Sequence, residues 1–409
     1  MFCLMEKNDI GFVRVYDAHG GKMKVNWEIK KLKDICDKGS SNVNMKSLDK
    51  MQGEYPIYGA SGFIQNVNFY HQEKEYIGII KDGSGIGRTM LLPPKSSVIG
   101  TLQYILPKEG NSIHFINYAL QSLDLSKYKQ GAAIPHIYFR DYGETEIVVP
   151  PLAEQKRIVA LLDQKFAAVG SLKANAQSNL QNAKDLFQAE LGKQFGMQNS
   201  ECGIVKLGDV CEFISGYAFE SKKYSLDEND TLLICGDNIV HCDFRWETIK
   251  KWNSNEYEGL KRFALQENDI VLAMDRPWVK TGLKIAMISN KEIPSLLVQR
   301  TAALRANSYF KSKYIYYALL ERGFTDYLLE QQTGVGVPHI SGKQIQNYEI
   351  VFPRSPSTQS EDLELCGIVE HLDSLQSKVR LLEKNYEKVI ADCDELKQSY
   401  LDKAFKGEL

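Results

Sequence analysis

The sequence predicts an α+β chain in which two globular mixed α/β domains are separated by two long antiparallel coiled-coil helices, with internal two-fold pseudosymmetry. Three observations predict this fold. A seven-residue motif occurs twice, a short apolar strand follows each copy, and a long helical pattern without proline follows each strand. Because both halves share this order, we expect one folding unit to be duplicated within the chain.

The duplicated motif is GAAIPHI at residues 131–137 and GVGVPHI at residues 334–340, 203 positions later. The strands that follow are EIVVP at residues 146–150 and EIVFP at residues 349–353. Short runs of β-branched residues that end at proline are typical of strands leading into a turn. Each copy therefore predicts the same path from a loop, through a strand, to the start of a helix.

The length of 409 residues is too great for one ordinary core, so two or more domains are expected. We expect an N-terminal extension with a short strand around 12–16, two domains, and a long helix after each domain. The predicted boundaries are 1–23 for the extension, 24–151 and 203–354 for the domains, and 152–198 and 361–409 for the helices.

The two domains open alike, at residues 27–35 and 203–210, each with a short strand followed by a helical turn. The offset is 175 positions between Leu32 and Leu207 but 203 at the shared motif, so the second domain carries 28 additional residues in its middle. Matching ends around a differing middle are expected of binding modules with different specificities. Neutral drift of surface loops is the alternative.

The second helical segment repeats apolar residues alternately four and three positions apart over 368–400. Subtracting 210 gives the corresponding positions over 158–190. A 3.5-residue repeat of this length predicts coiled-coil packing of the two helices against each other. In the alternative arrangement, each helix docks separately on its own domain. The predicted seam includes Leu172 and Leu186 with Ala176 and Ala183 on the first helix, and Leu382 and Leu396 on the second.

Net charge, apolar runs and cysteine spacing argue against three kinds of protein: one that coats nucleic acid, one that associates with a membrane and one that binds a metal. A formal net charge of −2 argues against indiscriminate coating of nucleic acid but allows sequence-specific binding, which depends on local charge. No apolar run reaches the ~20 residues that span a bilayer, and no signal peptide is recognised, so no membrane association is expected. The eight cysteines form no C-x-x-C pair, which suits a reducing cytoplasm. Cys235, His241 and Cys242 fit no standard zinc spacing, so we expect no metal and no cofactor.

Residues 150–159, PPLAEQKRIV, close a strand and open a long helix. Together with the opening segment 27–35, the paired Pro-His-Ile segments and the terminal LDKAFKGEL at 401–409, they resemble the specificity subunit of type I restriction-modification systems. The resemblance covers nearly the whole chain. The second copy departs from it at residues 353–359, where additional residues replace the compact proline turn.

The resemblance implies that each domain is a target recognition domain that reads one half of a bipartite site in double-stranded DNA. It implies that the two helices form the spacer that sets the distance between half-sites. The partners it implies are two methyltransferase subunits and, through them, restriction subunits. Adenine methylation and ATP-driven cleavage would belong to those partners, and the subunit itself would be non-catalytic.

Residue patterns agree with this reading. A helix of ~40 residues is ~60 Å long, or roughly 18 base pairs of DNA. The chain lacks both the Asn/Asp-Pro-Pro-aromatic tetrapeptide of amino methyltransferases and a GxxxxGK[ST] phosphate loop, so no catalytic residue is predicted. Residues 81–88 form a glycine-rich loop whose counterpart is 274–282. A DNA-facing loop, a plain hairpin turn and a nucleotide cradle at Gly83–Gly87 are the three readings.

The candidate DNA-contacting residues are cationic, amide and hydroxyl side chains expected in loops, since arginine favours guanine and asparagine or glutamine favours adenine. His136 and His339 belong to the shared motif and cannot encode two different half-sites, so a structural or backbone role is expected for both. A coiled-coil adaptor that never touches DNA is the remaining alternative. The candidates are Lys81, Ser84, Arg88, Lys129, Gln130, Tyr138 and Arg140 in the first domain, and Arg245, Arg276, Lys280, Gln331, Gln332, Thr333 and Lys343 in the second.

Overall fold

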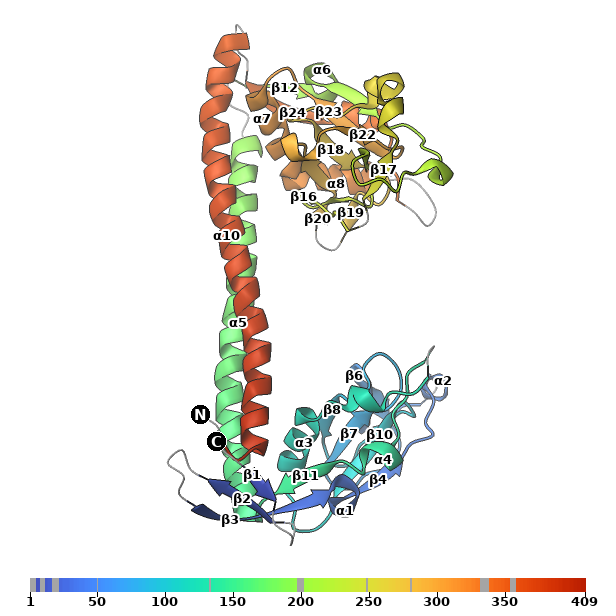
Figure 1. The fold of residues 1–409 in the computed structure, drawn as a ribbon, viewed down its shortest axis with the longest axis vertical. Helices are drawn as coiled ribbons and strands as arrows, with labels where there is room; N and C mark the ends of the chain where they lie inside the picture. Colours follow the sequence, from blue (N-terminus) through green and yellow to red (C-terminus); the bar gives the residue numbers. More distant parts are fainter. Residues whose placement is uncertain are drawn as a thin grey trace. The chain divides into compact units, whose positions relative to one another are not determined.

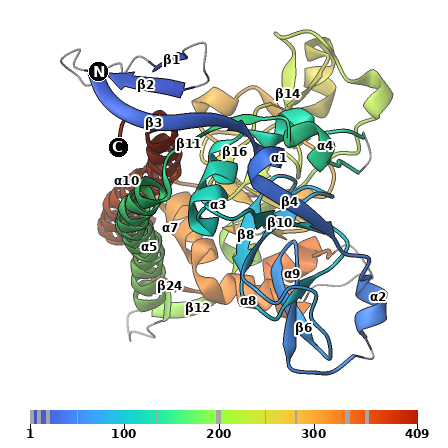
Figure 2. The same cartoon turned by 90° about the horizontal axis from the view of Figure 1, so that it is seen from below.

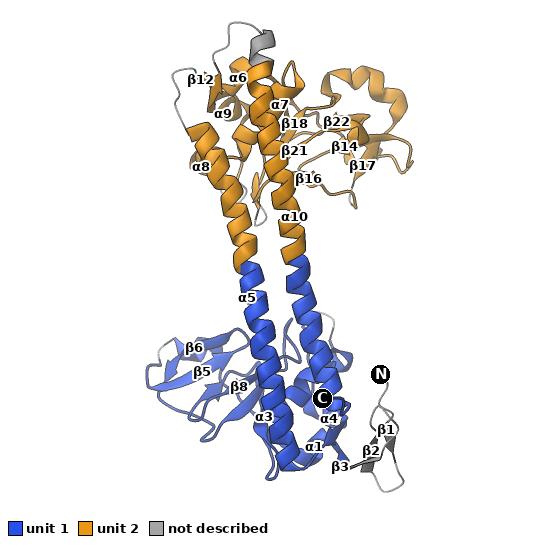
Figure 3. Cartoon of the chain, turned by 90° about the vertical axis from the view of Figure 1, so that its left-hand side faces the viewer, with its two compact units in different colours: residues 1–177, 387–409 blue, residues 178–386 orange. Residues whose placement is uncertain are grey.

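The computed structural model is a mixed helix and strand protein that divides into two compact units (Figures 1 and 3). The first unit comprises Met1–Gln177 and Glu387–Leu409, and the second comprises Ser178–Tyr386. Within the described ranges, none of the helices has the length and apolar character needed to cross a membrane. The structure describes residues 5–7, 12–16, 22–49, 51–131, 134–196, 202–247, 249–279, 282–331, 338–353 and 358–409.

The first unit opens with an antiparallel sheet that joins the start of the domain to its end. The strand expected around 12–16 is present as β2 and pairs with β3, which also pairs with β11. The turn of helix after β3 is fixed because Leu32 N donates to Thr145 O at 3.0 Å. The sheet order is β1-β2-β3-β11, and its elements are β1 (Met5–Lys7), β2 (Phe12–Tyr16), β3 (Lys22–Lys31), α1 (Leu32–Ile35) and β11 (Glu146–Val149).

The central sheet of the first unit has the order β4-β10-β7-β8. Its middle strand β7 is buried at every position, as expected for a run such as YIGII with apolar neighbours on both faces. Helix α3 lies between this sheet and the long helix α5 (Figure 2), and its Phe115 and Ile116 are buried there. The elements are β4 (Cys36–Ser40), β7 (Tyr76–Ile80), β8 (Thr89–Leu92), β10 (Leu102–Pro107) and α3 (Ile113–Ser122).

The remaining elements of the first unit surround this sheet. A second, three-stranded sheet has the order β6-β5-β9, in which β5 and β9 are parallel. The elements are α2 (Met45–Leu48), β5 (Tyr55–Gly59), β6 (Gly62–Val67), β9 (Ser97–Val98), the 3-10 turn η1 (Leu125–Tyr128) and α4 (Phe139–Tyr142).

The second unit repeats this framework, as the duplicated sequence predicts. Its central sheet has the order β13-β23-β18-β21, which matches β4-β10-β7-β8 strand for strand. Its opening also matches, because Leu207 N donates to Tyr348 O at 2.9 Å as Leu32 does to Thr145. The elements are β12 (Cys202–Lys206), α6 (Leu207–Val210), β13 (Glu212–Ser215), β18 (Ile270–Ala273), β21 (Ile285–Met287), β23 (Thr301–Arg305), α7 (Tyr309–Leu320) and β24 (Glu349–Pro353).

Most of the additional length of the second unit lies between β13 and β18. Residues 216–269 number 54, against 35 in the equivalent segment 41–75. They help build a sheet of order β17-β14-β22 with its own aromatic core around Trp252. The remaining elements of the second unit, inside and outside this segment, are η2 (Ser221–Lys223), β14 (Thr231–Ile234), β15 (Ile239–Val240), β16 (Asp243–Phe244), β17 (Lys250–Trp252), η3 (Ser254–Phe263), β19 (Trp278–Val279), β20 (Gly282–Leu283), η4 (Asn290–Glu292), β22 (Ser295–Leu297), α8 (Arg322–Gln331) and α9 (Gly342–Asn347).

Two long helices, α5 (Leu152–Gly196) and α10 (Thr358–Phe405), pack against each other. In the first unit they run antiparallel, since Leu162 lies in one buried cluster with Leu401 while Lys173 pairs with Asp394 at 2.5 Å. In the second unit Leu191 and Leu372 share a buried cluster. Each helix also packs on a domain, so helix pairing and domain docking coexist.

The predicted seam was wrong at four of its leucines. Leu172, Leu186, Leu382 and Leu396 are 50%, 56%, 39% and 38% exposed. Ala176 and Ala183, which the same repeat placed in the seam of α5 seven positions apart, are buried as predicted. A repeat of apolar residues shows that a helix has an apolar stripe. It does not show which of these residues face the partner helix, because a second stripe beside the seam has the same period.

Polar contacts fix each long helix to its domain. Gln155 is buried, its Nε2 donates to Pro150 O at 2.9 Å, and its Oε1 accepts from Ser112 N at 2.8 Å. Asp163 accepts a hydrogen bond from the Tyr118 hydroxyl of α3 at 2.5 Å. The residue 210 positions later, Asp373, accepts one from Tyr317 of α7. The same carboxylate thus fastens the domain helix to the long helix in both units.

Candidate nucleic-acid interface

The Pro-His-Ile segment of the first unit is fastened to the end of β7. Gly83 N donates to Pro135 O and Ile137 N donates to Lys81 O, both at 2.9 Å. Between these bonds, the Asp82 carboxylate accepts a hydrogen bond from Nδ1 of His136 at 2.6 Å. The motif therefore closes a small backbone ladder over the loop that follows β7.

The second unit repeats the arrangement bond for bond. Arg276 N donates to Pro338 O at 2.8 Å, and Ile340 N donates to Met274 O at 2.9 Å. The Asp275 carboxylate accepts a hydrogen bond from Nδ1 of His339 at 2.5 Å. We call this contact the Asp–His pair. In both units the imidazole holds the motif to the strand end, which is the structural role expected of the two histidines.

The aspartates of the two pairs were missed by sequence reasoning. Asp82 and Asp275 stand 193 positions apart, each one residue before the point at which the loop turns away from its strand. Aligning the ends of the two apolar strands, YIGII and IVLA, would have revealed the shared aspartate. It was overlooked because the flanking loop sequences differ.

We define the first polar surface as residues 81–88 together with the described part of 129–140. The Asp–His pair brings these two segments together, and with them all seven candidates of the first domain. Arg140 lies on α4 and not in a loop, with its guanidinium 4.7 Å from the centre of the Tyr138 ring. Gln130 Nε2 donates to Asp141 at 2.9 Å. Of the seven candidates, Lys81 is partly buried. The other six are exposed: Ser84, Arg88, Lys129, Gln130, Tyr138 and Arg140.

We define the second polar surface as residues 274–279, 299–300 and 338–343. Arg276 is exposed and has a φ of 45°, in the left-handed region that a side chain other than glycine seldom adopts. Burial lowers the pKa of Lys284; the charges of Asp237 and Cys235 oppose this shift, and those of Arg245 and Arg276 add to it. The candidates Arg245 and Arg276 thus influence the charge of a lysine that the sequence did not single out.

The other candidates of the second domain divide into two groups. Gln331 ends α8 and Lys343 lies on α9, so neither stands in a loop as expected, although both are exposed. The two are near each other, because Nε2 of Gln344 donates to Gln331 O at 2.8 Å. Lys280, Gln332 and Thr333 lie outside the described residues.

Arg300 is a further exposed cation that sequence reasoning missed. Its Nη1 donates to Asp275 Oδ2 at 2.9 Å, so it joins the Asp–His pair of the second unit. It stands in the short turn between β22 and β23. Nothing in the local sequence marks this turn, because only the fold places residue 300 beside residue 275.

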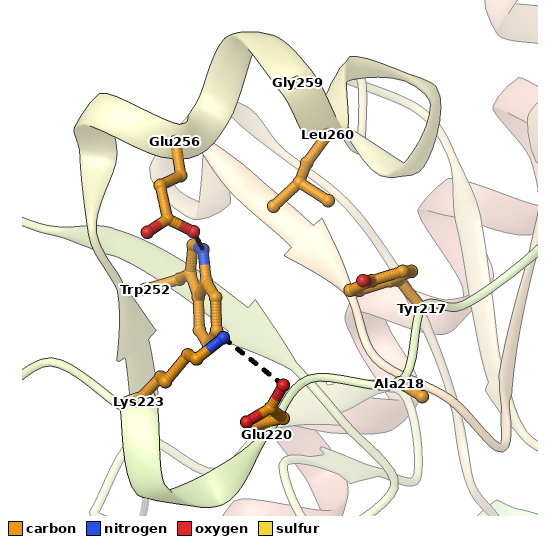
Figure 4. Close-up of a pocket in the computed structure, with 8 residues that line it drawn as sticks. All are labelled: Tyr217, Ala218, Glu220, Lys223, Trp252, Glu256, Gly259 and Leu260. Atoms are coloured by element: carbon orange, nitrogen blue, oxygen red, sulfur yellow. Dashed lines mark hydrogen bonds and ion pairs between the residues drawn. The ribbon is translucent and has the colours of Figure 1, made fainter.

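A pocket of about 400 Å³ adjoins this turn in the second unit (Figure 4). Its wall includes the indole of Trp252, whose Nε1 donates to Glu256 at 3.0 Å, and the ring of Tyr217. The carbonyl of Tyr217 accepts a hydrogen bond from Gln299 N at 2.7 Å, which connects the pocket to the turn that carries Arg300. In the described part of the chain, no group of three or more His, Cys, Asp or Glu residues is arranged to hold a metal ion.

Known proteins share both the sequence and the fold. Residues 24–180 and 199–389 match the family described as the type I restriction modification DNA specificity domain. The type I restriction enzyme MjaVIII specificity subunit of Methanocaldococcus jannaschii is 23% identical over 403 residues, covering 91% of each chain. The EcoAI specificity subunit of Escherichia coli is 31% identical over 179 residues, covering 44% of this chain and 29% of that protein.

A solved structure supports the same assignment at the level of the fold. A chain from a study of complex assembly and conformational transition of the type I restriction-modification system superposes with a TM-score of 0.68. The match covers 95% of this chain and 100% of that one at 19% identity. The family match, which spans most of the chain and both copies of the duplicated framework, shows that this chain belongs to the type I restriction modification DNA specificity family and is a specificity subunit of that class.

Proposed function

We propose that the first and second polar surfaces each read one half of a bipartite site in double-stranded DNA, and that the chain thereby gives a type I complex its sequence specificity. The observation that carries this proposal is the Asp–His pair, repeated in both units with different side chains around it. In each unit a backbone frame presents arginine, lysine or glutamine, the side chains that contact guanine, adenine and phosphate. Two such surfaces on one chain suit a target with two parts.

In this proposal the chain has no catalytic role, and adenine methylation and ATP-driven cleavage belong to partner subunits in the cytoplasm. The glycine-rich loop at Gly83–Gly87 supports this division. It leads directly into β8 (Thr89–Leu92) and not into a helix, so it lacks the helix N-terminus that binds phosphate in nucleotide sites. The side chain of Arg88 folds back on this loop, and its Nε donates a hydrogen bond to Gly85 O at 3.4 Å.

The exposed leucines support docking of two methyltransferase subunits on the long helices. Leu172 and Leu382 are related by the offset of 210 positions, and so are Leu186 and Leu396. Each unit therefore carries two of these four leucines, one on α5 and one on α10, in equivalent places. Single exposed leucines are common on protein surfaces, so the support comes from their repetition at equivalent places in the two units. Two equivalent sets suit two copies of one partner, and restriction subunits join through them.

Stoichiometry tests this docking. Leu172→Glu and Leu382→Glu should each remove one methyltransferase subunit, and the double variant should remove both, because a charge in an apolar contact is costly. Mass photometry of the mixed subunits measures the number bound. Leu226→Glu is the matched control, since Leu226 is 99% exposed and stands outside the helices. If the double variant still binds two subunits, the leucines are not the docking surface.

Helix length should set the gap between half-sites. Inserting seven residues into α5 and seven at the equivalent place in α10 keeps the heptad register. The insertion lengthens each helix by ~10 Å, which corresponds to roughly three base pairs. We expect the methylated motif to gain about three unspecified base pairs while both half-site sequences stay the same. A change in a half-site sequence instead would contradict the spacer role.

Mapping of methylated adenines tests the central claim. Cells that express this chain with its cognate methyltransferase should methylate one discontinuous sequence. Replacing residues 203–354 by the equivalent segment of a relative should change one half-site and leave the other unchanged, which also assigns each half to its unit. If no discontinuous sequence is methylated, the proposal fails.

The adaptor alternative makes the opposite prediction. Arg140→Ala combined with Arg276→Ala would leave site choice and methylation intact if the chain never touched DNA. We expect the double variant to bind DNA weakly and to methylate poorly, because both arginines are exposed on the proposed contact surfaces.

A further inference from the structure

The turn between β22 and β23 differs between the units at a position that the backbone aligns. Met274 N donates to Arg300 O at 2.9 Å, and in the first unit Lys81 N donates to Thr101 O at 3.0 Å. Met274 and Lys81 each precede the aspartate of an Asp–His pair. Arg300 therefore occupies in the second unit the place that Thr101 occupies in the first.

The backbone conformation of Arg300 is strained, which points to a functional role for its side chain. Its φ is 63°, in the left-handed region that glycine adopts freely and other residues adopt at a cost. Arg276, on the other side of Asp275, also has a positive φ of 45°. Residues held in such conformations cluster at functional sites. Both lie beside the same carboxylate.

Asp275 orients the guanidinium of Arg300 without covering it. Nη1 of Arg300 donates to one carboxylate oxygen at 2.9 Å, while His339 bonds the other oxygen. The side chain of Arg300 nevertheless remains 70% exposed. One nitrogen of the planar guanidinium is thus engaged, and the exposure of the side chain leaves its other donors accessible. A fork held in this way is suited to the two acceptors of guanine in the major groove.

We propose that Arg300 is a base-reading residue that contacts a guanine in the half-site recognised by the second unit. Thr101 gives the first unit no such contact. This inference rests on the proposed function, because it assumes that the second polar surface faces DNA. It assigns to the second half-site a G·C pair whose recognition depends on one side chain.

Two substitutions separate base reading from other roles. Arg300→Gly relieves the left-handed backbone and removes the fork, whereas Arg300→Lys keeps the charge and loses bidentate geometry. The full chain in complex with its methyltransferase is assayed by mapping methylated adenines in genomic DNA and by binding to duplexes with single base-pair changes. Arg322→Ala is the matched control, an arginine of α8 whose side chain is 82% exposed. Thermal unfolding verifies that each variant is folded.

We expect both variants to lose discrimination, roughly tenfold to a hundredfold, at one G·C pair of the second half-site. The first half-site and the gap should stay as in the wild type, both variants should unfold cooperatively as folded proteins do, and Arg322→Ala should leave both half-sites and the gap unchanged. A second half-site that contains no G·C pair would overturn the inference. So would uniform weakening by Arg300→Gly on all duplexes with normal discrimination by Arg300→Lys, because that pattern indicates a phosphate contact. If the wild-type complex methylates no discontinuous sequence, it is the proposed function that fails.

Discussion

Replacing Gln155 by leucine should weaken the junction between the first unit and helix α5. The side chain is buried and makes two hydrogen bonds to backbone groups, at Pro150 O and Ser112 N. Leucine keeps the volume but leaves both groups unpaired, at about 1–3 kcal/mol each. The added apolar burial returns about 1–2 kcal/mol. Taken at the middle of these ranges, the two unpaired groups cost about 4 kcal/mol and burial returns about 1.5, so we expect a loss of about 2.5 kcal/mol in the free energy of unfolding.

Urea unfolding followed by far-ultraviolet circular dichroism measures this loss. Hydrogen exchange of the Ser112 amide reports on the same contact locally, because the amide loses its acceptor in the variant. Lys156→Leu, one position along the exposed side of α5, should change the free energy by less than about 0.5 kcal/mol. If Gln155→Leu matched the wild type in both stability and Ser112 exchange, the two hydrogen bonds of Gln155 would not stabilise the junction.

Three further changes test other parts of the structure. Leu372→Ala should cost about 3 kcal/mol of unfolding free energy by leaving a cavity, whereas Leu382→Ala on the same helix should cost under about 1 kcal/mol; urea unfolding of both variants decides. Lys284→Met should raise the unfolding temperature at neutral pH and lower DNA affinity, since burial lowers the pKa of this lysine and so penalises its charged form; a lower unfolding temperature would contradict this. Hydrogen bonds from two lysines lower the pKa of Glu144 to about 2, so its contribution to stability is present above about pH 4.5 and lost as the pH falls towards 2. Glu144→Gln should flatten that part of the profile in acid unfolding, and an unchanged profile would show that the contact contributes nothing.

The duplicated framework could be predicted because it rests on local signals. Proline, apolar strands and long proline-free repeats are readable one segment at a time, and the copies confirm each other. The helix seam could not be assigned at every position. The repeat places Ala183 and Leu186 in the same predicted seam and does not say which of them lies at its centre. In the structure the helices pack on the alanine, which allows close approach, and the leucine lies at the surface.

The candidate site was predicted in part for a similar reason. Loops flanking the shared motif were identified, and the Asp–His pair does bring them together in the first unit. Arg300 was missed because its importance depends on a contact between positions 275 and 300 that only the strand order creates. Sequence patterns identify neighbours along an element, whereas the partners of a turn residue are set by how strands cross.

Under the proposed function, two half-sites of different sequence are read by one fold, and the backbone ladder that closes over the loop in both units makes this possible. The bonds that close it come mainly from backbone groups, which donate and accept in the same way whatever side chain they carry. The side-chain contact that recurs in both copies is the Asp–His pair. Gly83 in one unit can therefore stand where Arg276 stands in the other, and Thr101 where Arg300 stands. The backbone has a positive φ at both Gly83 and Arg276. Glycine adopts this conformation freely, so it suits a position whose side chain makes no contact with DNA, whereas an arginine there adopts it at a cost in strain. Specificity can change by substitution at such positions because the frame does not depend on them.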